Sequence, residues 1–213
     1  MTVLERQARA GVVPVVVLDR AEDAVPTARA LIEGGIDVME ITLRTPAAAE
    51  AIHQVAVHCP QMLVGAGTVL NVQQAELAVR MGARFIVSPG FDRTLTQWCL
   101  DRQIPIVPGC VTPTEIMAAV NMGLQVLKFF PAGTYGGLSA MKNLAAPFAG
   151  VKFMPTGGVN AENLRTYLRA PMVHAVGGSW ICPRAAIAAG EFEKITALCR
   201  EARQAVLEGE AEA

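Results

Sequence analysis

The sequence predicts an α/β fold, a (β/α)8 TIM barrel with an N-terminal helix before the first strand. Eight short runs rich in β-branched residues recur along its 213 residues. Their starts lie roughly 20 to 26 residues apart, and helical patterns fill most of the gaps, as repeated βα units require. Eight such units are the number that closes a barrel. An open doubly wound sheet is the main alternative, because periodicity alone is compatible with both folds.

The strand-like runs are short and apolar, and most of them end in Gly or Pro. Short apolar runs bounded by turn residues are typical of strands buried in a parallel sheet. The predicted strands begin near Val12, Val38, Leu63, Phe85, Pro105, Gln125, Val151 and His174.

The helical patterns between them carry start and stop signals. Residues Thr2 to Ala10 predict a helix over the N-terminal end of the barrel, and Asp23 to Glu33 predict one that ends at Gly34-Gly35. The longest predicted helix runs from Arg184 to Leu207 with a break at Gly190, and Glu208 to Ala213 are expected to fray. Cap-forming side chains or Pro predict helix starts at Thr45-Pro46, Asn71, Asp92, Thr112-Pro113 and Asn160.

We expect one domain over residues 1–213, since no linker, low-complexity segment or shift in composition divides the chain. Hydrophobic residues make up 52% of it, and its mean hydropathy is +0.36. That fraction exceeds the usual level of about 45 to 50%. Part of the surplus is therefore expected at interfaces between subunits.

Charge and cysteine content restrict the partners and the compartment. A net charge of -1 and a pI near 6.3 give no basic footprint, so we expect no nucleic-acid partner and no membrane partner. The first residues lack a signal-peptide pattern, and polar residues interrupt the uncharged stretch from Ala51 to Ala75. The five scattered cysteines contain no CxxC pair and predict reduced thiols in a cytoplasmic protein.

The run from Gln125 to Gly133, QVLKFFPAG, contains one lysine, Lys128, inside a short apolar strand. The charged form of such a lysine is costly to desolvate, which favours a neutral, nucleophilic amine. Alternatively, the side chain reaches solvent at the strand end or pairs with a carboxylate. The strand alone leaves the two interpretations open.

Polar residues also follow one face of the second predicted strand. Glu40 and Thr42 share parity, and Arg44 is next on that face. This pattern predicts a proton-transfer carboxylate beside an arginine that grips a substrate carboxylate. An ion pair between Glu40 and Arg44 is the structural alternative.

Small residues and turn signals mark the other strand ends, where a barrel gathers its active site. Thr68 follows Gly65-Ala66-Gly67 and offers a hydroxyl, and Pro89 is placed to line a pocket. The last two strands end in Thr156-Gly157-Gly158 and Gly177-Gly178-Ser179. Loops after strands seven and eight form the usual phosphate site of barrel enzymes, so we expect an anion there.

Metal and serine-hydrolase chemistry fit the sequence poorly. His53 and His58 are five residues apart on a predicted helix and do not share a face, and His174 stands alone. No Ser-His-Asp arrangement and no GxGxxG after the first strand are present. We therefore expect no metal and no cofactor.

With these residues in view, the chain resembles the class I aldolases that cleave 2-keto-3-deoxy-6-phosphogluconate (KDPG). The runs around Lys128 and from Glu40 to Arg44 are specific to that family, whereas the glycine turns are shared with many phosphate-binding barrels. The likeness extends nearly end to end, through GIDVMEITLRTP, VGAGTVLN, FIVSPGFD, PIVPGCVTPTEI, LKFFPAG, MPTGGVN and VGGSWICP.

The resemblance implies that Lys128 forms a Schiff base and that Glu40 is the acid/base. It implies that Arg44 and Thr68 hold the pyruvate carboxylate and that Pro89 and Phe130 line the pocket. The products would be pyruvate and D-glyceraldehyde 3-phosphate, with a further activity on 4-hydroxy-2-oxoglutarate, and the family is usually homotrimeric. The phosphate end of the substrate would be held by Thr156, Gly157, Gly158, Gly178 and Ser179.

One loop departs from the family pattern. Many relatives carry a glutamate and an asparagine before the two glycines of the segment that reads Gly133-Thr134-Tyr135-Gly136-Gly137 here. This loop follows the lysine strand, so the departure bears on the aldehyde end of the substrate. A phosphosugar epimerase or isomerase, and a non-catalytic phosphometabolite-binding barrel, remain as alternatives, but both leave Lys128 and the Glu40/Arg44 pair without a role.

Overall fold

Eight strands alternate with helices along residues 1–211, the part of the chain that the computed structural model describes. The first half contains α1 (Val3–Ala10), β1 (Val12–Val16), η1 (Ala21–Asp23), α2 (Ala24–Glu33), β2 (Val38–Thr42), α3 (Ala48–His58), β3 (Leu63–Gly67), α4 (Val72–Arg80) and β4 (Ile86–Val87). The second half contains α5 (Arg93–Asp101), β5 (Ile106–Val107), α6 (Pro113–Val120), β6 (Val126–Phe129), α7 (Gly137–Ala145), β7 (Lys152–Pro155), α8 (Leu164–Leu168), β8 (Val176–Gly178), α9 (Arg184–Ala188) and α10 (Phe192–Ala211). A strand lies at each of the predicted positions.

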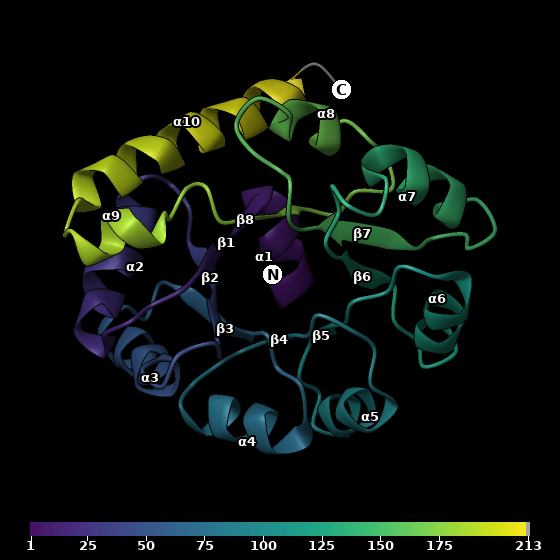
Figure 1. The fold of residues 1–213 in the computed structure, drawn as a ribbon, viewed down its shortest axis with the longest axis horizontal. Coiled ribbons are helices and arrows are strands. Elements are labelled where there is room, and N and C mark those ends of the chain that lie inside the picture. The colour runs from purple at the N-terminus through teal and green to yellow at the C-terminus, as the bar shows by residue number, and fades with distance from the viewer. Residues whose placement is uncertain (212–213) are drawn as a thin grey trace.

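The strands form a curled parallel sheet, which confirms the predicted α/β class. Six of them are hydrogen-bonded in the order β5-β4-β3-β2-β1-β8, and β6 pairs with β7. Isolated parallel bridges join Gly109 to Lys128 and Thr156 to Gly177. A doubly wound sheet reverses its strand order at a switch point. The order from β5 to β1 contains no such reversal, and Figure 1 shows the helices other than α1 around the outside of the strands.

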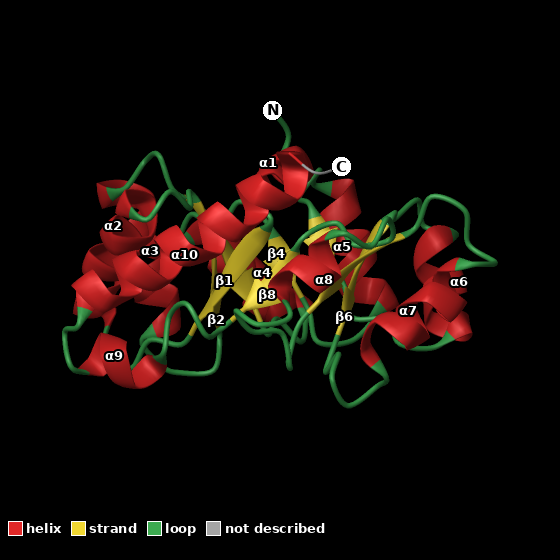
Figure 2. Ribbon diagram, turned by 90° about the horizontal axis from the view of Figure 1, so that it is seen from above, coloured by secondary structure: helices red, strands yellow, loops and turns green. Residues whose placement is uncertain are grey.

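Helix α1 covers one end of the sheet, as the sequence predicts (Figure 2). Thr2 caps it in a reciprocal capping box with Glu5. Arg6 Nη2 donates to the carbonyl of Asp37, which precedes β2, at 2.9 Å, and it also bonds to the carbonyl of Gln61, which precedes β3. The helix is therefore fixed against the amino ends of the strands, which leaves the carboxyl ends for the site.

Three of the predicted helix starts carry the expected cap, and two are wrong. Asn71, Asp92 and Thr112 each accept a hydrogen bond from the backbone three residues on. Helix α3, in contrast, begins at Ala48 rather than at Thr45-Pro46, because Thr45 Oγ1 donates to Leu18 O at 2.5 Å instead of capping the helix.

Helix α8 also begins later than predicted, at Leu164. The side chain of Asn160 accepts from the backbone of Glu162 and Asn163 and holds an intervening turn. Helix α8 has only five residues and begins at Leu164, so its dipole would stabilise an anion at Gly157-Gly158 only weakly.

The break at Gly190 is confirmed, because α9 ends at Ala188 and α10 begins at Phe192. Gly190 has a φ of +72°, which suits glycine at a helix end. The frayed tail predicted for Glu208 to Ala213 is wrong as far as Ala211, since Glu208 pairs with Arg165 and accepts from Gln204 at 2.9 Å. Residues 212 and 213 of that prediction lie outside the described residues.

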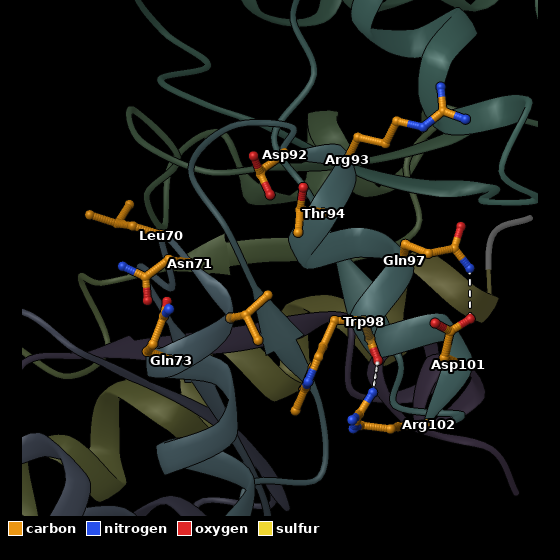
Figure 3. A pocket seen from close by; sticks show the side chains of 11 residues that line it. Leu70, Asn71, Gln73, Asp92, Arg93, Thr94, Gln97, Trp98, Asp101 and Arg102 are labelled. Carbon is orange, nitrogen blue, oxygen red and sulfur yellow. Dashed lines mark hydrogen bonds between the residues drawn. The ribbon is translucent and has the colours of Figure 1, made fainter.

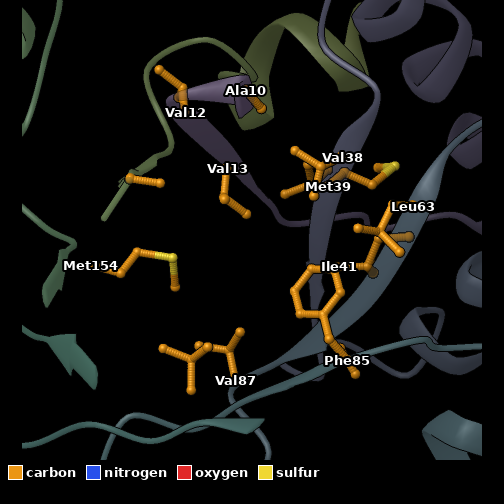
Figure 4. Close-up of a cluster of buried hydrophobic side chains, with 14 of the residues drawn as sticks. Ala10, Val12, Val13, Val38, Met39, Ile41, Leu63, Phe85, Val87 and Met154 are labelled. Atoms are coloured by element: carbon orange, nitrogen blue, oxygen red, sulfur yellow. The ribbon is translucent and has the colours of Figure 1, made fainter. Parts of the chain in front are cut away.

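Apolar side chains from successive strands meet in one buried core. Figure 4 shows part of this cluster, with residues from α1, from β1 to β4 and from β7. Its labelled members are Ala10, Val12, Val13, Val38, Met39, Ile41, Leu63, Phe85, Val87 and Met154. Within residues 1–211, no helix has the combination of length and apolar character needed to cross a membrane.

Candidate active site

Lys128 on β6 and Glu40 on β2 form the centre of the candidate site. Lys128 Nζ lies 3.4 Å from Glu40 Oε1, and the two side chains are only 5% and 0% exposed. Removing two charges from water is costly, and this cost can exceed the attraction between them. A buried pair of this kind is therefore better explained by a functional role than by a contribution to stability. Glu40 Oε2 has no hydrogen-bond partner within the described chain, which leaves one carboxylate oxygen free to exchange protons.

The backbone on both sides fixes Lys128 in place. Lys128 N donates to Pro108 O at 2.8 Å, and Cys110 N donates to Lys128 O at 2.9 Å. On the other side Lys128 is in register with Met154 of β7. The Phe130 ring, predicted to line the pocket, has its centroid 5.4 Å from Lys128 Nζ, within the range of a cation–π contact.

Within residues 1–211, Arg44 forms no ion pair with Glu40. Thr42 is buried and donates to Val16 O at 3.2 Å, whereas Arg44 is exposed beyond the strand end and makes no ion pair within residues 1–211. The partner of Glu40 is Lys128, so the alternative of a Glu40–Arg44 ion pair is not observed. The alternative that Lys128 pairs with a carboxylate is observed, and the carboxylate belongs to the predicted acid/base.

Thr68 is the first residue after β3, and Pro89 is the second residue after β4, at the same end of the sheet. Thr68 has a φ of +56°, a strained conformation for a β-branched residue. The carbonyl oxygen of Pro89 lies only 2.1 Å from the position that a Cβ on Gly109 would take. Glycine at position 109 therefore leaves room for the backbone of Pro89 and Gly90. Within the described chain no hydrogen bond joins Thr68 or Pro89 to Lys128 or Glu40.

The residues predicted for the phosphate end lie together at the ends of β7 and β8. A Cβ on Gly177 would lie 2.1 Å from Thr156 Oγ1, and a parallel bridge joins the same two residues. Gly157 and Gly158 have left-handed φ values of +84° and +88°, which only glycine adopts without strain. Ser179 is exposed one residue beyond β8.

The divergent loop after β6 contacts this same glycine turn. Ala132 N donates to Thr156 O at 2.8 Å, and Gly133 N donates to Gly157 O at 2.9 Å. A Cβ on Gly158 would lie 3.1 Å from Gly133 Cα. The segment that departs from the family pattern, Gly133 to Gly137, thus begins beside the predicted phosphate end.

Sequence reasoning missed an ion pair that joins the loop after β1 to the first residue of α9. The Arg184 guanidinium donates two hydrogen bonds to the Asp19 carboxylate, at 2.7 and 2.5 Å. This bidentate bond lowers the pKa of Asp19 and raises that of Arg184. The two residues are 165 positions apart, and no local pattern links them.

The histidines are placed apart from the site. His53 and His58 are exposed on α3. His174 Nε2 lies 3.0 Å from Leu4 O of α1, and burial lowers the pKa of this imidazole. Its contact with α1 places it at the opposite end of the sheet from Lys128.

A groove of about 800 Å³ lies between α4 and α5, away from these residues (Figure 3). Some of its polar groups contact one another: Gln97 donates to Asp101 at 2.7 Å, and the Arg102 guanidinium lies 4.5 Å from the Trp98 ring centroid. None of the predicted site residues lines it. Its lining is Leu70, Asn71, Val72, Gln73, Asp92, Arg93, Thr94, Gln97, Trp98, Asp101 and Arg102.

A family model and relatives that are 40 to 50% identical to this chain describe aldolases. The sequence profile of the family described as KDPG and KHG aldolase matches residues 3–198. The 2-dehydro-3-deoxy-phosphogluconate aldolase of Treponema pallidum is 50% identical over 206 residues, which cover 97% of this chain and 98% of that protein.

Two solved structures extend the likeness to the fold. The KDPG aldolase of Legionella pneumophila, with pyruvate captured as a covalent carbinolamine, superimposes with a TM-score of 0.90 at 42% identity, covering 94% of this chain and 97% of its own. The KDPG aldolase of Zymomonas mobilis with 3-phosphoglycerate gives a TM-score of 0.87 at 40% identity and covers 94% and 95%. The chain therefore belongs to the KDPG and KHG aldolase family.

Proposed function

We propose that this protein is a class I aldolase that cleaves KDPG to pyruvate and D-glyceraldehyde 3-phosphate, the carbon–carbon cleavage of the Entner-Doudoroff route. The observation that carries the proposal is the buried Lys128–Glu40 pair, with Nζ 3.4 Å from Oε1. A related KDPG aldolase, 42% identical, holds pyruvate as a covalent carbinolamine. Such an adduct requires a nucleophilic amine, and Lys128 is the lysine of this chain that is buried beside a carboxylate.

The chemistry follows from that pair. The neutral amine of Lys128 attacks C2 of the keto acid, and loss of water from the carbinolamine gives a protonated imine. Glu40 carries protons during this step and then removes the proton of the C4 hydroxyl, directly or through a water. The C3–C4 bond breaks, its electrons enter the imine, and the aldehyde leaves. Protonation of the enamine at C3 and hydrolysis release pyruvate. The imine is the electron sink, so the cycle needs no metal and no cofactor.

The remaining predicted residues hold the two ends of the substrate. Arg44 and Thr68 bind the carboxylate, as two hydrogen-bond donors at neighbouring strand ends. Pro89 and Phe130 line the pocket, supported by the 5.4 Å contact of the Phe130 ring with Lys128 Nζ. The phosphate end is bound at the adjacent ends of β7 and β8 by Thr156, Gly157, Gly158, Gly178 and Ser179.

4-Hydroxy-2-oxoglutarate is a second proposed substrate, cleaved to pyruvate and glyoxylate. The description of the family includes KHG aldolase, in which KHG stands for 2-keto-4-hydroxyglutarate, another name for this keto acid. This keto acid reacts through the same imine at C2, and it lacks the phosphate that the loops after β7 and β8 would bind. It therefore depends on Lys128, Glu40 and Arg44 and not on Ser179.

We also propose that the eight strands close into a complete (β/α)8 barrel within one domain, residues 1–213. The parallel bridges Gly109–Lys128 and Thr156–Gly177, at the two edges of the β6–β7 pair, support closure. The protein is further proposed to act in the cytoplasm as a homotrimer. Its five cysteines, all buried and free, suit a reducing compartment.

A coupled assay tests the function. Purified protein given KDPG should release pyruvate, measured as NADH oxidation by added lactate dehydrogenase. Lys128→Arg should abolish release, because a guanidinium stays protonated and forms no imine. Lys142→Arg, an exposed lysine on α7, is the matched control and should keep full activity. A phosphosugar epimerase or a binding module would release no pyruvate at all, and that result would contradict the proposal.

A further inference from the structure

The carboxyl group of Glu40 occupies the space that a side chain on Gly67 would need. A Cβ on Gly67 would lie 1.9 Å from Glu40 Oε1, 2.5 Å from Cδ and 2.4 Å from Cγ. These are the three nearest atoms, and real Cβ contacts are essentially never shorter than about 3.0 Å. Because Cγ is among them, a rotation of the carboxyl group alone would not relieve the clash.

Backbone conformation does not explain glycine at this position. Gly67 is absent from the glycines with positive φ, so its backbone accommodates alanine. It ends β3, in register with Thr42, and its carbonyl accepts from Leu43 N at 2.8 Å. Gly67 is therefore held in the sheet while its missing side chain leaves room for Glu40.

We propose that Gly67 is a positioning residue that holds the Glu40 carboxyl group against Lys128. This inference rests on the proposed acid–base role of Glu40. With alanine at position 67, Glu40 has to leave the conformation in which Oε1 lies 3.4 Å from Lys128 Nζ. The lysine remains in place, because its backbone is bonded to Pro108 and Cys110. Substrate binding survives, and proton transfer is lost.

The test is a double-mutant cycle of Gly67→Ala and Glu40→Ala, with kcat, KM and Tm measured for each variant. Gly67→Ala alone should lower kcat for KDPG by about 100-fold or more, the lower end of what a positioned acid–base group contributes, and leave KM nearly unchanged. In the Glu40→Ala background it should lower kcat no further, because the group that it displaces is gone.

Gly34→Ala is the matched control for a steric clash outside the site. Its added methyl would lie 2.2 Å from Cys199 Cβ, between α2 and α10, and Gly34 also has an ordinary φ of -75°. It should lower Tm and leave kcat unchanged. If Gly67→Ala alone does not fold, the Gly67→Ala/Glu40→Ala double variant tests the inference. It should fold with the Tm of Glu40→Ala, because the atoms that clash with the new methyl group belong to Glu40.

Three results would overturn the inference. They are a Gly67→Ala enzyme with wild-type kcat, an equal loss of kcat in both backgrounds, and a double variant that fails to fold although Glu40→Ala folds. If Glu40→Ala itself keeps wild-type kcat, the proposed acid–base role is wrong as well. A defective Glu40→Ala beside an active Gly67→Ala refutes the positioning role alone.

Discussion

Arg44 is exposed after β2 and makes no ion pair within residues 1–211, so its guanidinium is free to receive a carboxylate. We expect Arg44→Ala to weaken binding of both KDPG and 4-hydroxy-2-oxoglutarate, by on the order of 2 to 5 kcal/mol once the charge pair with substrate is desolvated. Steady-state KM for both keto acids measures this. Arg93→Ala, an exposed arginine in the groove beside α5, should leave both values unchanged. An unaltered KM in Arg44→Ala would remove this residue from the site.

Ser179 is proposed to bind the phosphate end of the substrate and not its reacting end. Ser179→Ala should raise KM for KDPG by roughly tenfold, since a hydrogen bond to a charged group contributes about 1.5 to 3 kcal/mol. It should spare 4-hydroxy-2-oxoglutarate, which carries no phosphate. Parallel kinetics on the two substrates check this. Equal damage to both would place Ser179 away from the phosphate.

The sequence allowed single candidate residues to be chosen where a local pattern marked them. It did not predict which residues distant along the chain would contact them. Lys128 was a candidate because one lysine interrupts an apolar strand, and Glu40 because it shares a strand face with Thr42; the structure buries both side chains. That Glu40 pairs with Lys128 rather than with Arg44 depends on strands 88 residues apart. The Asp19–Arg184 bond and the space at Gly67 likewise arise only when strand ends meet.

At the level of elements, the positions of the strands and of the capped helices followed from local sequence patterns. Two predicted helix starts were wrong, one because of a long-range hydrogen bond and the other because of a competing turn. Thr45 is a good N-cap by composition, but its hydroxyl bonds to the loop after β1. Asn160 forms a turn with its own neighbours before α8 begins. Side chains that favour caps also favour turns, so the sequence alone does not separate these outcomes.

The contact between α1 and the segment before β8 predicts a pH dependence of stability. His174, bonded to Leu4 O, has a pKa lowered chiefly by burial. Just below the unfolded-state pKa of about 6.5, the unfolded chain binds more protons than the folded one, so stability falls as pH falls. His174→Gln should flatten this fall. Tm measured from pH 7.5 downward tests it, and an unchanged slope in His174→Gln would contradict it.

At the scale of the whole molecule, the apolar surplus reappears as exposed side chains. Tyr135, Leu70 and Met117 are 52%, 56% and 53% exposed. An interface between copies of the chain would bury side chains of this kind, and closed cyclic symmetry is the common arrangement. We expect a homotrimer in which each Lys128 site is complete within one subunit. Light scattering at micromolar protein should give about three times the 22.5 kDa chain mass. A monomer would refute the assembly and leave the chemistry intact.

Borohydride trapping tests the central claim most directly, that the amine of Lys128 carries the reaction as an imine. Protein treated with pyruvate and borohydride should lose activity and gain the mass of one reduced pyruvate adduct per chain. Peptide mapping should place that adduct on Lys128, and Lys128→Arg should gain none. Glu40→Ala should label more slowly at the same lysine, because the proton carrier for imine formation is gone. Labelling at Lys142 or Lys152 instead, or activity that survives stoichiometric reduction, would contradict the account.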